Sequence, residues 1–461
     1  MSGLARRRLL ALLAGAAAAL RALPAAAAVR IFDVEDYGAA GDGRTPDTQS
    51  IQRAIDAAAA AGGGARVLLR RGRTYLTGPL RLAAGIDFRV DGVLRVSIDP
   101  ADYAQPSLLH AKSAPGLTIS GSGTIDGRSP EFMERYDAAD EWWIPKAFRP
   151  RLIVLEDCER LTIRGVTIVD APSWTVHLVG CRGVLVDGIT IRNQRDVPNC
   201  DGIDPDHCQD VVIRNCRITC GDDATVIKTT AAFPQYGPST RIHVHDCVLD
   251  TQDSGLKIGT ETTQDIHDIR FERCRIVSSC RGLTIQLRDP GDVHDILFRD
   301  VDFVSRYHSA PWWGRGEAIS FTAIPRNADT KVGTIRDVRV ERVRGRAENS
   351  VRIEGLGGGR VRDVTLERVD LTLGRTTAYP GAVFDNRPTA VVPPIEPHPT
   401  PAISIRNAEA VTLRDCAVRW SGALPESFTH ALQAENAPGL TFSNFRGEAA
   451  HPERFAAIRI S

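Results

Sequence analysis

The sequence lacks an excess of charge of either sign. Lysine and arginine together number 57, aspartate and glutamate also number 57, and the formal net charge is zero. This balance argues against a nucleic-acid binder that depends on a basic surface. Beyond the N-terminal segment, the chain also lacks the roughly 20 consecutive apolar residues that a membrane-spanning helix needs. A hydrophobic content of 43% with 25% charged residues excludes a disordered or collagen-like chain.

The N-terminal segment has the pattern of an export signal. Three arginines, Arg6, Arg7 and Arg8, precede two leucines, a run of alanine and leucine, and small residues after Pro24. A charged start, an apolar middle and a small-residue end are typical of a signal peptide. The paired arginines are similar to a twin-arginine signal, with a Sec signal or an uncleaved anchor as the alternative. We predict a signal over residues 1–28, the twin-arginine machinery as a partner, and a periplasmic or extracellular protein.

Short strand-like triplets recur through most of the chain. Examples are Leu117-Thr118-Ile119, Val211-Val212-Ile213 and Ile269-Arg270-Phe271; most starts lie 23 to 31 residues apart, with three gaps of 42 to 47. Each unit is too small to bury its own apolar side chains, but stacked units bury them against one another. The pattern predicts an all-β fold, a single-stranded parallel β-helix. A β-sandwich or a propeller fits the spacing less well.

The ends of such a stack need protection, and a helix is predicted near the N-terminus. Residues 50–60 form an amphipathic pattern that Asp47 or Thr48 can cap and that the glycines at 62–64 end. We expect this capping helix within an N-terminal module and first coils over residues 29–110, followed by a catalytic β-helix over residues 111–461. The ten cysteines lack zinc-ligand spacing. We expect most of them to be free and buried, like small apolar residues in the stack.

Two acidic runs form the strongest candidate for chemistry. Asp201 and Asp204 follow Asn199 in one run. Asp222 stands 21 residues after Asp201, about one coil away, and Asp223 follows it directly. Adjacent coils lie about 4.8 Å apart, so these carboxylates should share one face. Their repulsion raises at least one pKa, which suits acid–base glycoside cleavage, and a separation of about 6.5–9.5 Å would imply inversion. Ordinary turn residues and a calcium site are the alternatives.

These runs resemble the motifs of the polygalacturonase-like glycoside hydrolases, family 28, of the pectin-lyase-like superfamily. The run from Asn199 looks like the Asn-Thr-Asp motif, with cysteine in place of threonine, and Gly221-Asp222-Asp223 looks like the Gly-Asp-Asp motif. The resemblance implies a right-handed coil. It also implies that Asp222 is the general acid, that Asp201 and Asp223 hold and deprotonate the water, and that Asn199 and Asp204 support them. His177 lies in a further segment that resembles the family.

Two departures from the family concern substrate recognition. Ser254 stands where the family often has a histidine, and Thr284 and Gln286 replace the arginine and lysine of a motif that binds the substrate carboxylate. Other candidate substrate-binding residues are taken from the same coils and from a long insertion. They are Lys228, Lys257, Gln286, Arg288, Trp312 and Trp313. Lys257 should point toward the aspartates, since its neighbours Leu256 and Ile258 point inward.

The sequence therefore predicts an exported glycoside hydrolase. The expected mechanism is inverting and Asp-based, without a metal or other cofactor, and the expected partner is a pectic or related acidic polysaccharide or oligosaccharide. We expect a monomer. A calcium-dependent polysaccharide lyase and a non-catalytic glycan-binding β-helix remain as alternatives, because this fold carries all three roles.

Overall fold

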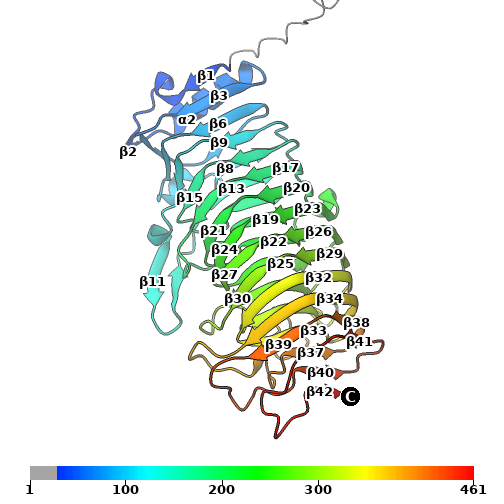
Figure 1. Cartoon of the computed structure of the whole chain (residues 1–461). Coiled ribbons are helices and arrows are strands. Elements are labelled where there is room, and N and C mark those ends of the chain that lie inside the picture. The colour runs from blue at the N-terminus through cyan, green and yellow to red at the C-terminus, as the bar shows by residue number, and fades with distance from the viewer. Residues whose placement is uncertain (1–28) are drawn as a thin grey trace, which may run out of the picture.

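The computed structural model describes residues 29–461, and these residues form a right-handed parallel β-helix (Figure 1). The strands of successive coils lie side by side in parallel register along the whole length. The fold expected from the repeat is confirmed. The predicted export signal at residues 1–28 lies outside the described residues. No helix within residues 29–461 is long and apolar enough to cross a membrane.

One wall of the coil is a single sheet of 13 parallel strands. In chain order it contains β5 (Leu80–Arg81), β8 (Ser107–Lys112), β13 (Arg151–Glu156), β16 (Val176–Val179), β19 (Ile203–Asp206), β22 (Thr225–Thr229), β25 (Ser254–Thr262), β28 (Arg281–Leu287), β31 (Glu317–Ala323), β33 (Asn349–Gly355), β37 (Ile403–Arg406), β40 (Leu432–Glu435) and β42 (Ile458–Ile460). We call it the groove sheet, because its outer face carries the predicted aspartates.

The other walls belong to a 25-stranded sheet that runs in two columns. The first column contains β1 (Ile31–Asp33), β3 (Ala65–Leu69), β6 (Ile86–Val90), β9 (Thr118–Ser120), β14 (Thr162–Arg164), β17 (Arg182–Asp187), β20 (Gln209–Arg214), β23 (Ser239–His245), β26 (Ile266–Glu272), β29 (Val293–Arg299), β32 (Thr334–Ala347), β34 (Arg360–Leu373), β38 (Ala408–Arg414) and β41 (Thr441–Ser443). The second contains β2 (Asp42–Pro46), β4 (Thr74–Thr77), β7 (Val93–Val96), β10 (Thr124–Asp126), β15 (Thr167–Val169), β18 (Thr190–Arg192), β21 (Arg217–Cys220), β24 (Val248–Thr251), β27 (Arg275–Ser279), β30 (Asp302–Ser305) and β39 (Ala417–Trp420). The long strands β32 and β34 pair in both columns and join them.

The interior is filled by side chains that stack from coil to coil. In the first column, Ile213, Val244, Phe271, Phe298 and Val340 lie in register on successive strands, and all are buried. Phe271 and Phe298 stack with ring centroids 4.8 Å apart. The residue between two inward positions of a triplet points outward, which explains the apolar–polar–apolar pattern of the sequence.

The cysteines belong to this interior. All ten are free and buried, as the sequence predicted. Cys216, Cys247 and Cys274 occupy one position of successive coils, each directly after a residue with positive φ at the corner between the two columns: Asn215, Asp246 and Arg273. On the next three coils this position is occupied by valine, and on the coil after those by Cys416. A thiol at this position therefore serves as a small apolar side chain.

The N-terminal end is covered by helix α2 (Thr48–Ala60), which contacts β1, β3, β5 and β6. It begins two residues earlier than predicted, and it buries Ile51, Ala54, Ile55 and Ala58 against the first coils. Asp47 is its N-cap residue, but its carboxylate accepts the amides of Ala40 and Gly41 instead of capping the helix. Strand pairing continues across residue 110, since β6 pairs with β9 and β8 with β13.

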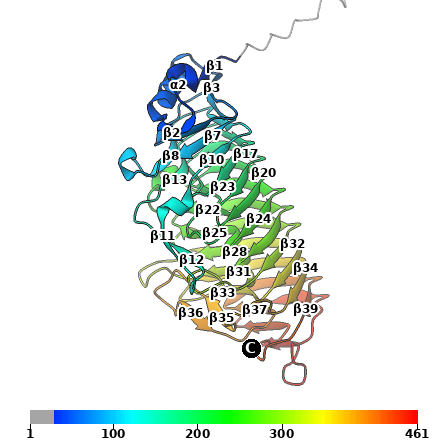
Figure 2. The same ribbon diagram turned by 90° about the vertical axis from the view of Figure 1, so that its left-hand side faces the viewer.

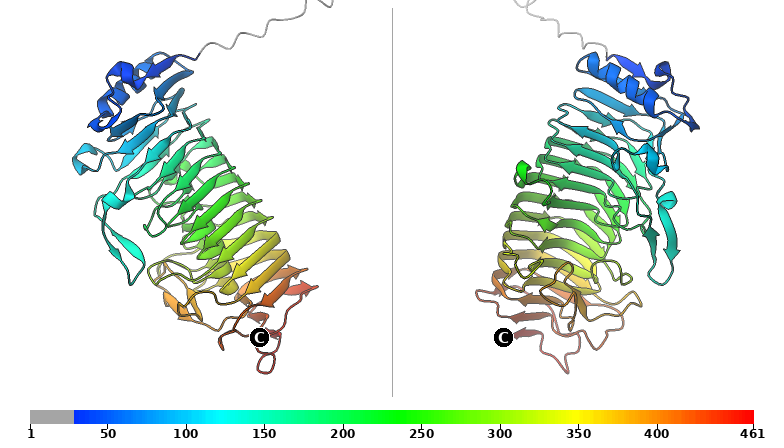
Figure 3. Two further views of the ribbon diagram at one scale, coloured as in Figure 1. Left: turned by 60° about the vertical axis from the view of Figure 1, so that its left-hand side comes forward. Right: turned by 180° about the vertical axis from the view of Figure 1, so that it is seen from behind.

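Three insertions project over the outer face of the groove sheet (Figures 2 and 3). They are the hairpin of β11 (Met133–Asp137) and β12 (Trp142–Pro145), a loop over residues 306–316, and a segment over residues 374–402 with β35 (Val383–Asp385) and β36 (Ile395–Pro397). The hairpin tip contacts the other two insertions, because Ser309 donates to the Asp140 carbonyl and Tyr379 to Glu141.

Short 3-10 helices complete the described chain: η1 (Val34–Tyr37), η2 (Pro100–Asp102), η3 (Ser129–Phe132) and η4 (Pro234–Tyr236).

Candidate active site

A pocket of about 400 Å³ opens on the groove sheet beneath the insertions. Its floor comes from the coils of β16, β19, β22 and β25, and its walls come from the hairpin, the 306–316 loop, and residues Arg326 and Pro388. Five carboxylates line it, together with three basic side chains and four tryptophans. The pocket thus combines titratable groups with the apolar ring faces that sugar binding uses.

The stack brings the two acidic runs together. Asp201 directly precedes the glycine before β19, and Asp222 and Asp223 precede β22 on the next coil; the amide of Gly202 donates to the Asp223 carbonyl at 2.9 Å. One carboxylate oxygen of each of the three aspartates lies within 4.8 Å of the others. The predicted alignment is confirmed, but the nearest oxygens are closer than the expected 6.5–9.5 Å. The separation alone therefore does not select inversion.

Burial and mutual repulsion change the acidity of this cluster. Desolvation, followed by the charges of Asp201 and Asp223, raises the pKa of Asp222 to about 7. Desolvation and the charge of Asp204 raise the pKa of Asp201 well above its ordinary value. A carboxyl group with a pKa near 7 keeps its proton through the weakly acidic range, which a general acid requires.

Two lysines place positive charge beside the cluster. Lys257 Nζ lies 2.6 Å from an Asp223 oxygen, which confirms that Lys257 points toward the aspartates. Lys228 Nζ lies 3.1 Å from Glu261 and 4.9 Å from the centre of the Trp174 ring. Both side chains are almost fully buried, and both line the pocket.

The predicted supporting residues divide into two groups. Asn199 contacts the proposed acid, because its amide and Nδ2 lie 3.2 and 3.4 Å from Asp222 Oδ2. Asp204 is fully buried and does not line the pocket, and burial raises its pKa to about 8. His177 also lies behind the pocket wall: its Nδ1 accepts from Arg151 and its Nε2 contacts Asp206 at 3.2 Å. Asp204 and His177 were both candidate substrate-binding residues, and neither lines the pocket; Asp204 lies beside Asp201, whose pKa its charge raises.

The predictions for Arg288 and Gln286 also need correction. Arg288 is fully buried and donates to the carbonyls of Leu287, Thr322 and Asn386. Gln286 is buried and donates to the carbonyl of Arg387. Neither lines the pocket. The cause is the insertion over residues 374–402, which covers the groove sheet at β28 and converts positions expected to bind sugar into an interface between loop and coil.

The two tryptophans predicted to bind substrate lie at the pocket, although Trp312 is only 3% exposed. Trp312 and Trp313 both line the pocket, and Trp142 of the hairpin packs edge-to-face on Trp312 with ring centroids 5.9 Å apart. Trp174 lines the floor. The tryptophans come from three separate segments, so their convergence depends on how the insertions fold over the sheet.

Three charged residues of the pocket were missed by the sequence analysis: Asp253, Glu261 and Arg326. Glu261 lies in an irregular stretch of β25, where Ile227 pairs with Ile258 but Thr229 pairs with Thr262, so that Lys228 faces three residues. Such an irregularity redirects a side chain, and Gly259 within the strand is the sequence signal that could have indicated it. Desolvation, followed by the charge of Asp223, raises the pKa of Asp253 to about 8.

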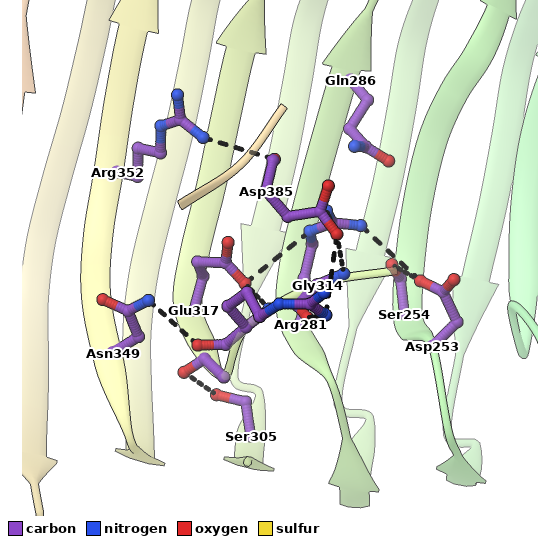
Figure 4. Close-up of polar contacts among 12 residues, drawn as sticks. Asp253, Ser254, Arg281, Gln286, Ser305, Gly314, Glu317, Asn349, Arg352 and Asp385 are labelled. Carbon is purple, nitrogen blue, oxygen red and sulfur yellow. Dashed lines mark hydrogen bonds and ion pairs between the residues drawn. The ribbon is translucent and has the colours of Figure 1, made fainter. Parts of the chain in front are cut away.

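Beyond the pocket, the same face of the sheet carries a buried network of charges (Figure 4). In register after Ser254 come Arg281, Glu317 and Asn349. The guanidinium of Arg281 lies 3.7–3.8 Å from Asp253, Glu317 and Asp385. Asp385 also accepts the amide of Gly314 at 2.8 Å. The network fixes two insertions to the coil and closes the groove at β28.

Comparison with known proteins agrees with this geometry. The family model described as "Glycosyl hydrolases family 28" matches residues 67–383. A probable polygalacturonase of Vitis vinifera is 29% identical over 280 residues, which cover 54% of this chain and 56% of that protein. The chain thus spans about half the length of the curated relatives it matches.

Solved structures extend the similarity to nearly the whole fold. An exopolygalacturonase from Thermotoga maritima has a TM-score of 0.66 and 22% identity, covering 86% of this chain and 92% of that one. A family 28 exopolygalacturonase from Yersinia enterocolitica has a TM-score of 0.66 and 18% identity, covering 91% and 78%. At these identities the likeness shows the β-helix architecture.

Proposed function

Because the chain belongs to glycosyl hydrolases family 28, we propose that it hydrolyses glycosidic bonds of a pectic polysaccharide or oligosaccharide. The observation that carries the proposal is the cluster of Asp201, Asp222 and Asp223 at the floor of a tryptophan-lined pocket. Polygalacturonases among the curated relatives support the pectic substrate.

In the proposed mechanism, Asp222 donates its proton to the oxygen of the leaving sugar. Its raised pKa keeps it protonated, and Asn199 holds its carboxyl group toward the pocket. Asp223, whose charge is balanced by Lys257, accepts a proton from the attacking water while Asp201 orients that water. Water attack on the face opposite the leaving group inverts the anomeric centre.

The first prediction concerns the product. Hydrolysis of a defined pectic oligosaccharide, followed directly by proton NMR, should give the anomer opposite to that of the cleaved bond. Retention of the anomer would contradict the water-attack mechanism. Unsaturated products that absorb in the ultraviolet would show a lyase instead.

The lyase alternative needs a bound calcium ion, and the acidic cluster offers three oxygen ligands that suit one. The contacts of the cluster favour the hydrolase. One carboxylate oxygen of Asp223 already forms an ion pair with the Lys257 ammonium at 2.6 Å. Lys228 adds a second positive charge nearby. A divalent cation at the same place would be repelled by both lysines. Chelator should therefore leave turnover unchanged in the product assay.

The second prediction concerns pH. Because activity needs protonated Asp222, kcat/KM should fall as the pH rises through about 7. Because the three neighbouring carboxyl groups act together as acid and base, the profile should be bell-shaped, and its two limbs report the coupled set and not single residues. The measurement is kcat/KM from reducing ends at constant ionic strength. An alkaline limb near pH 4, the ordinary range of a free aspartate, would contradict the raised pKa.

We also propose that the protein is exported before it meets its substrate. The support is the charged, apolar and small-residue order of residues 1–28, together with a substrate class that occurs in cell walls. Replacing Arg6 and Arg7 by lysine should block export if the twin-arginine route is used.

A further inference from the structure

Every basic side chain that lines the pocket, within the described residues, is paired with a carboxylate of the same chain. The basic side chains come from three different segments, and each partner lies beside its cation. The pairs are Lys228 with Glu261 at 3.1 Å, Lys257 with Asp223 at 2.6 Å, and Arg326 with Asp289 at 2.8 Å. Each positive charge is neutralised before a substrate enters.

The other titratable groups that line the pocket are carboxyl groups, and they supply no positive charge to a substrate. Asp201, Asp222 and Asp253 line it in addition to the two carboxylates already paired there, Asp223 and Glu261. A sugar carboxylate in this space would approach several carboxyl groups and would have to compete with Glu261 or Asp223 for a buried lysine. Burying a charge without a partner of its own is costly.

The next coil supplies no further cation to the pocket. Thr284 is in register with Lys257, and it is uncharged and fully buried. Arg281 begins β28 and Arg288 directly follows it, but both are fully buried outside the pocket, beneath the 374–402 insertion. The coil of β25 therefore carries a paired cation in the pocket, whereas the next coil, at β28, is covered by the insertion.

We propose that the sugar ring held in this pocket carries no ionised carboxylate. It is an uncharged pyranose: a neutral sugar of the pectic chain, or a uronate whose carboxyl group is esterified. Trp174 and Trp313, which are partly exposed in the pocket, offer apolar faces on which such a ring stacks. This inference rests on the proposed hydrolysis and specifies which sugar occupies its pocket.

The test compares kcat/KM of the wild-type protein for three oligosaccharides of equal length. They are a free-acid oligogalacturonide, its methyl ester, and an oligosaccharide in which galacturonate alternates with rhamnose. We expect at least one of the last two to exceed the free acid by roughly tenfold, the scale of one charge-assisted hydrogen bond. Which of the two does so distinguishes an esterified from a neutral ring.

A second measurement tests the cause. Glu261→Gln keeps the shape of the side chain and releases Lys228, and should raise the ratio of free-acid to ester activity by roughly tenfold. Asp289→Asn releases Arg326 in the same way. The matched control is Glu272→Gln on β26 of the other sheet, which pairs with Arg299 at 3.4 Å and should leave the ratio unchanged.

The outcomes separate the two proposals. If the free acid is the best substrate of the wild-type protein, the inference about the uncharged ring is overturned while hydrolysis stands. If none of the three oligosaccharides yields new reducing ends, the proposed function itself fails. The wild-type protein could prefer the uncharged ring while neither Glu261→Gln nor Asp289→Asn changes that preference. Pairing of the basic side chains would then not be its cause, and the inference as argued from that pairing would be overturned.

Discussion

Asp222→Asn is expected to reduce turnover by at least about 100-fold, the usual scale for loss of a general acid. Asparagine fills the same space and can keep the contact with Asn199, but it has no proton of suitable acidity for the leaving oxygen. Asp222 is partly exposed at the pocket floor, so the variant should fold like the wild-type protein. The measurement is kcat from single-turnover and steady-state assays on the best oligosaccharide.

The matched control for this variant is Asp268→Asn. Asp268 lies on β26 with positive φ, a conformation that asparagine adopts readily, and it is partly exposed on the other sheet. Its turnover should equal that of the wild-type protein. Near-normal turnover in Asp222→Asn would remove Asp222 from the mechanism. Loss of turnover accompanied by unchanged glycan binding would exclude the non-catalytic glycan-binding alternative.

The site was predictable where it depends on the repeat. A period of about one coil between Asp201 and Asp222 places them on neighbouring rungs, and alternation within the strand directs Lys257 to the same face. These relations are local and periodic, so the sequence contains them. The stack of Cys216, Cys247 and Cys274 follows from the same logic.

The rest of the site depends on contacts that no period encodes. Glu261 reaches Lys228 through an irregular pairing in β25, and Arg288 loses its expected place because a segment about 100 residues later covers it. A side chain that points out of the coil is exposed only when no other segment of the chain folds over its strand. The insertions form the pocket wall, and their path is set by long-range pairs such as Ser309 with Asp140.

Asp385→Asn is expected to destabilise the protein by about 3–5 kcal/mol, the scale of removing one partner from a buried ion pair. Asp385 is almost fully buried. Its carboxylate lies 2.6 Å from Arg387, 3.7 Å from Arg281 and 3.8 Å from Arg315. Without its charge, three guanidinium groups lose a shared partner, and those of Arg281 and Arg315 are buried. Urea unfolding at pH 7 measures the loss.

The pH dependence of this contribution has a definite sign. Desolvation alone would raise the pKa of Asp385, but its bonds with Arg387 and the charge of Arg281 hold that pKa below its ordinary value. The stabilisation is therefore fully present above the unfolded-state pKa of about 3.9 and is lost as the pH falls below it. The difference in unfolding free energy between the wild-type protein and Asp385→Asn should shrink in acid. A constant difference from pH 7 to 3 would contradict an electrostatic origin.

The same variant should weaken substrate binding more than it slows chemistry. Asp385 holds Gly314 of the 306–316 loop and orients Arg387, which donates to the Trp312 carbonyl at 2.7 Å and lies over the Trp313 ring. Loss of this anchor displaces the tryptophan wall while the aspartate cluster on the coil stays in place, so KM should rise by roughly tenfold with a smaller change in kcat.

The double variant Asp385→Asn/Arg387→Gln removes one of the guanidinium groups left without a partner and should recover part of the stability. Asp370→Asn, at an exposed pair with Arg419, is the control and should change neither quantity.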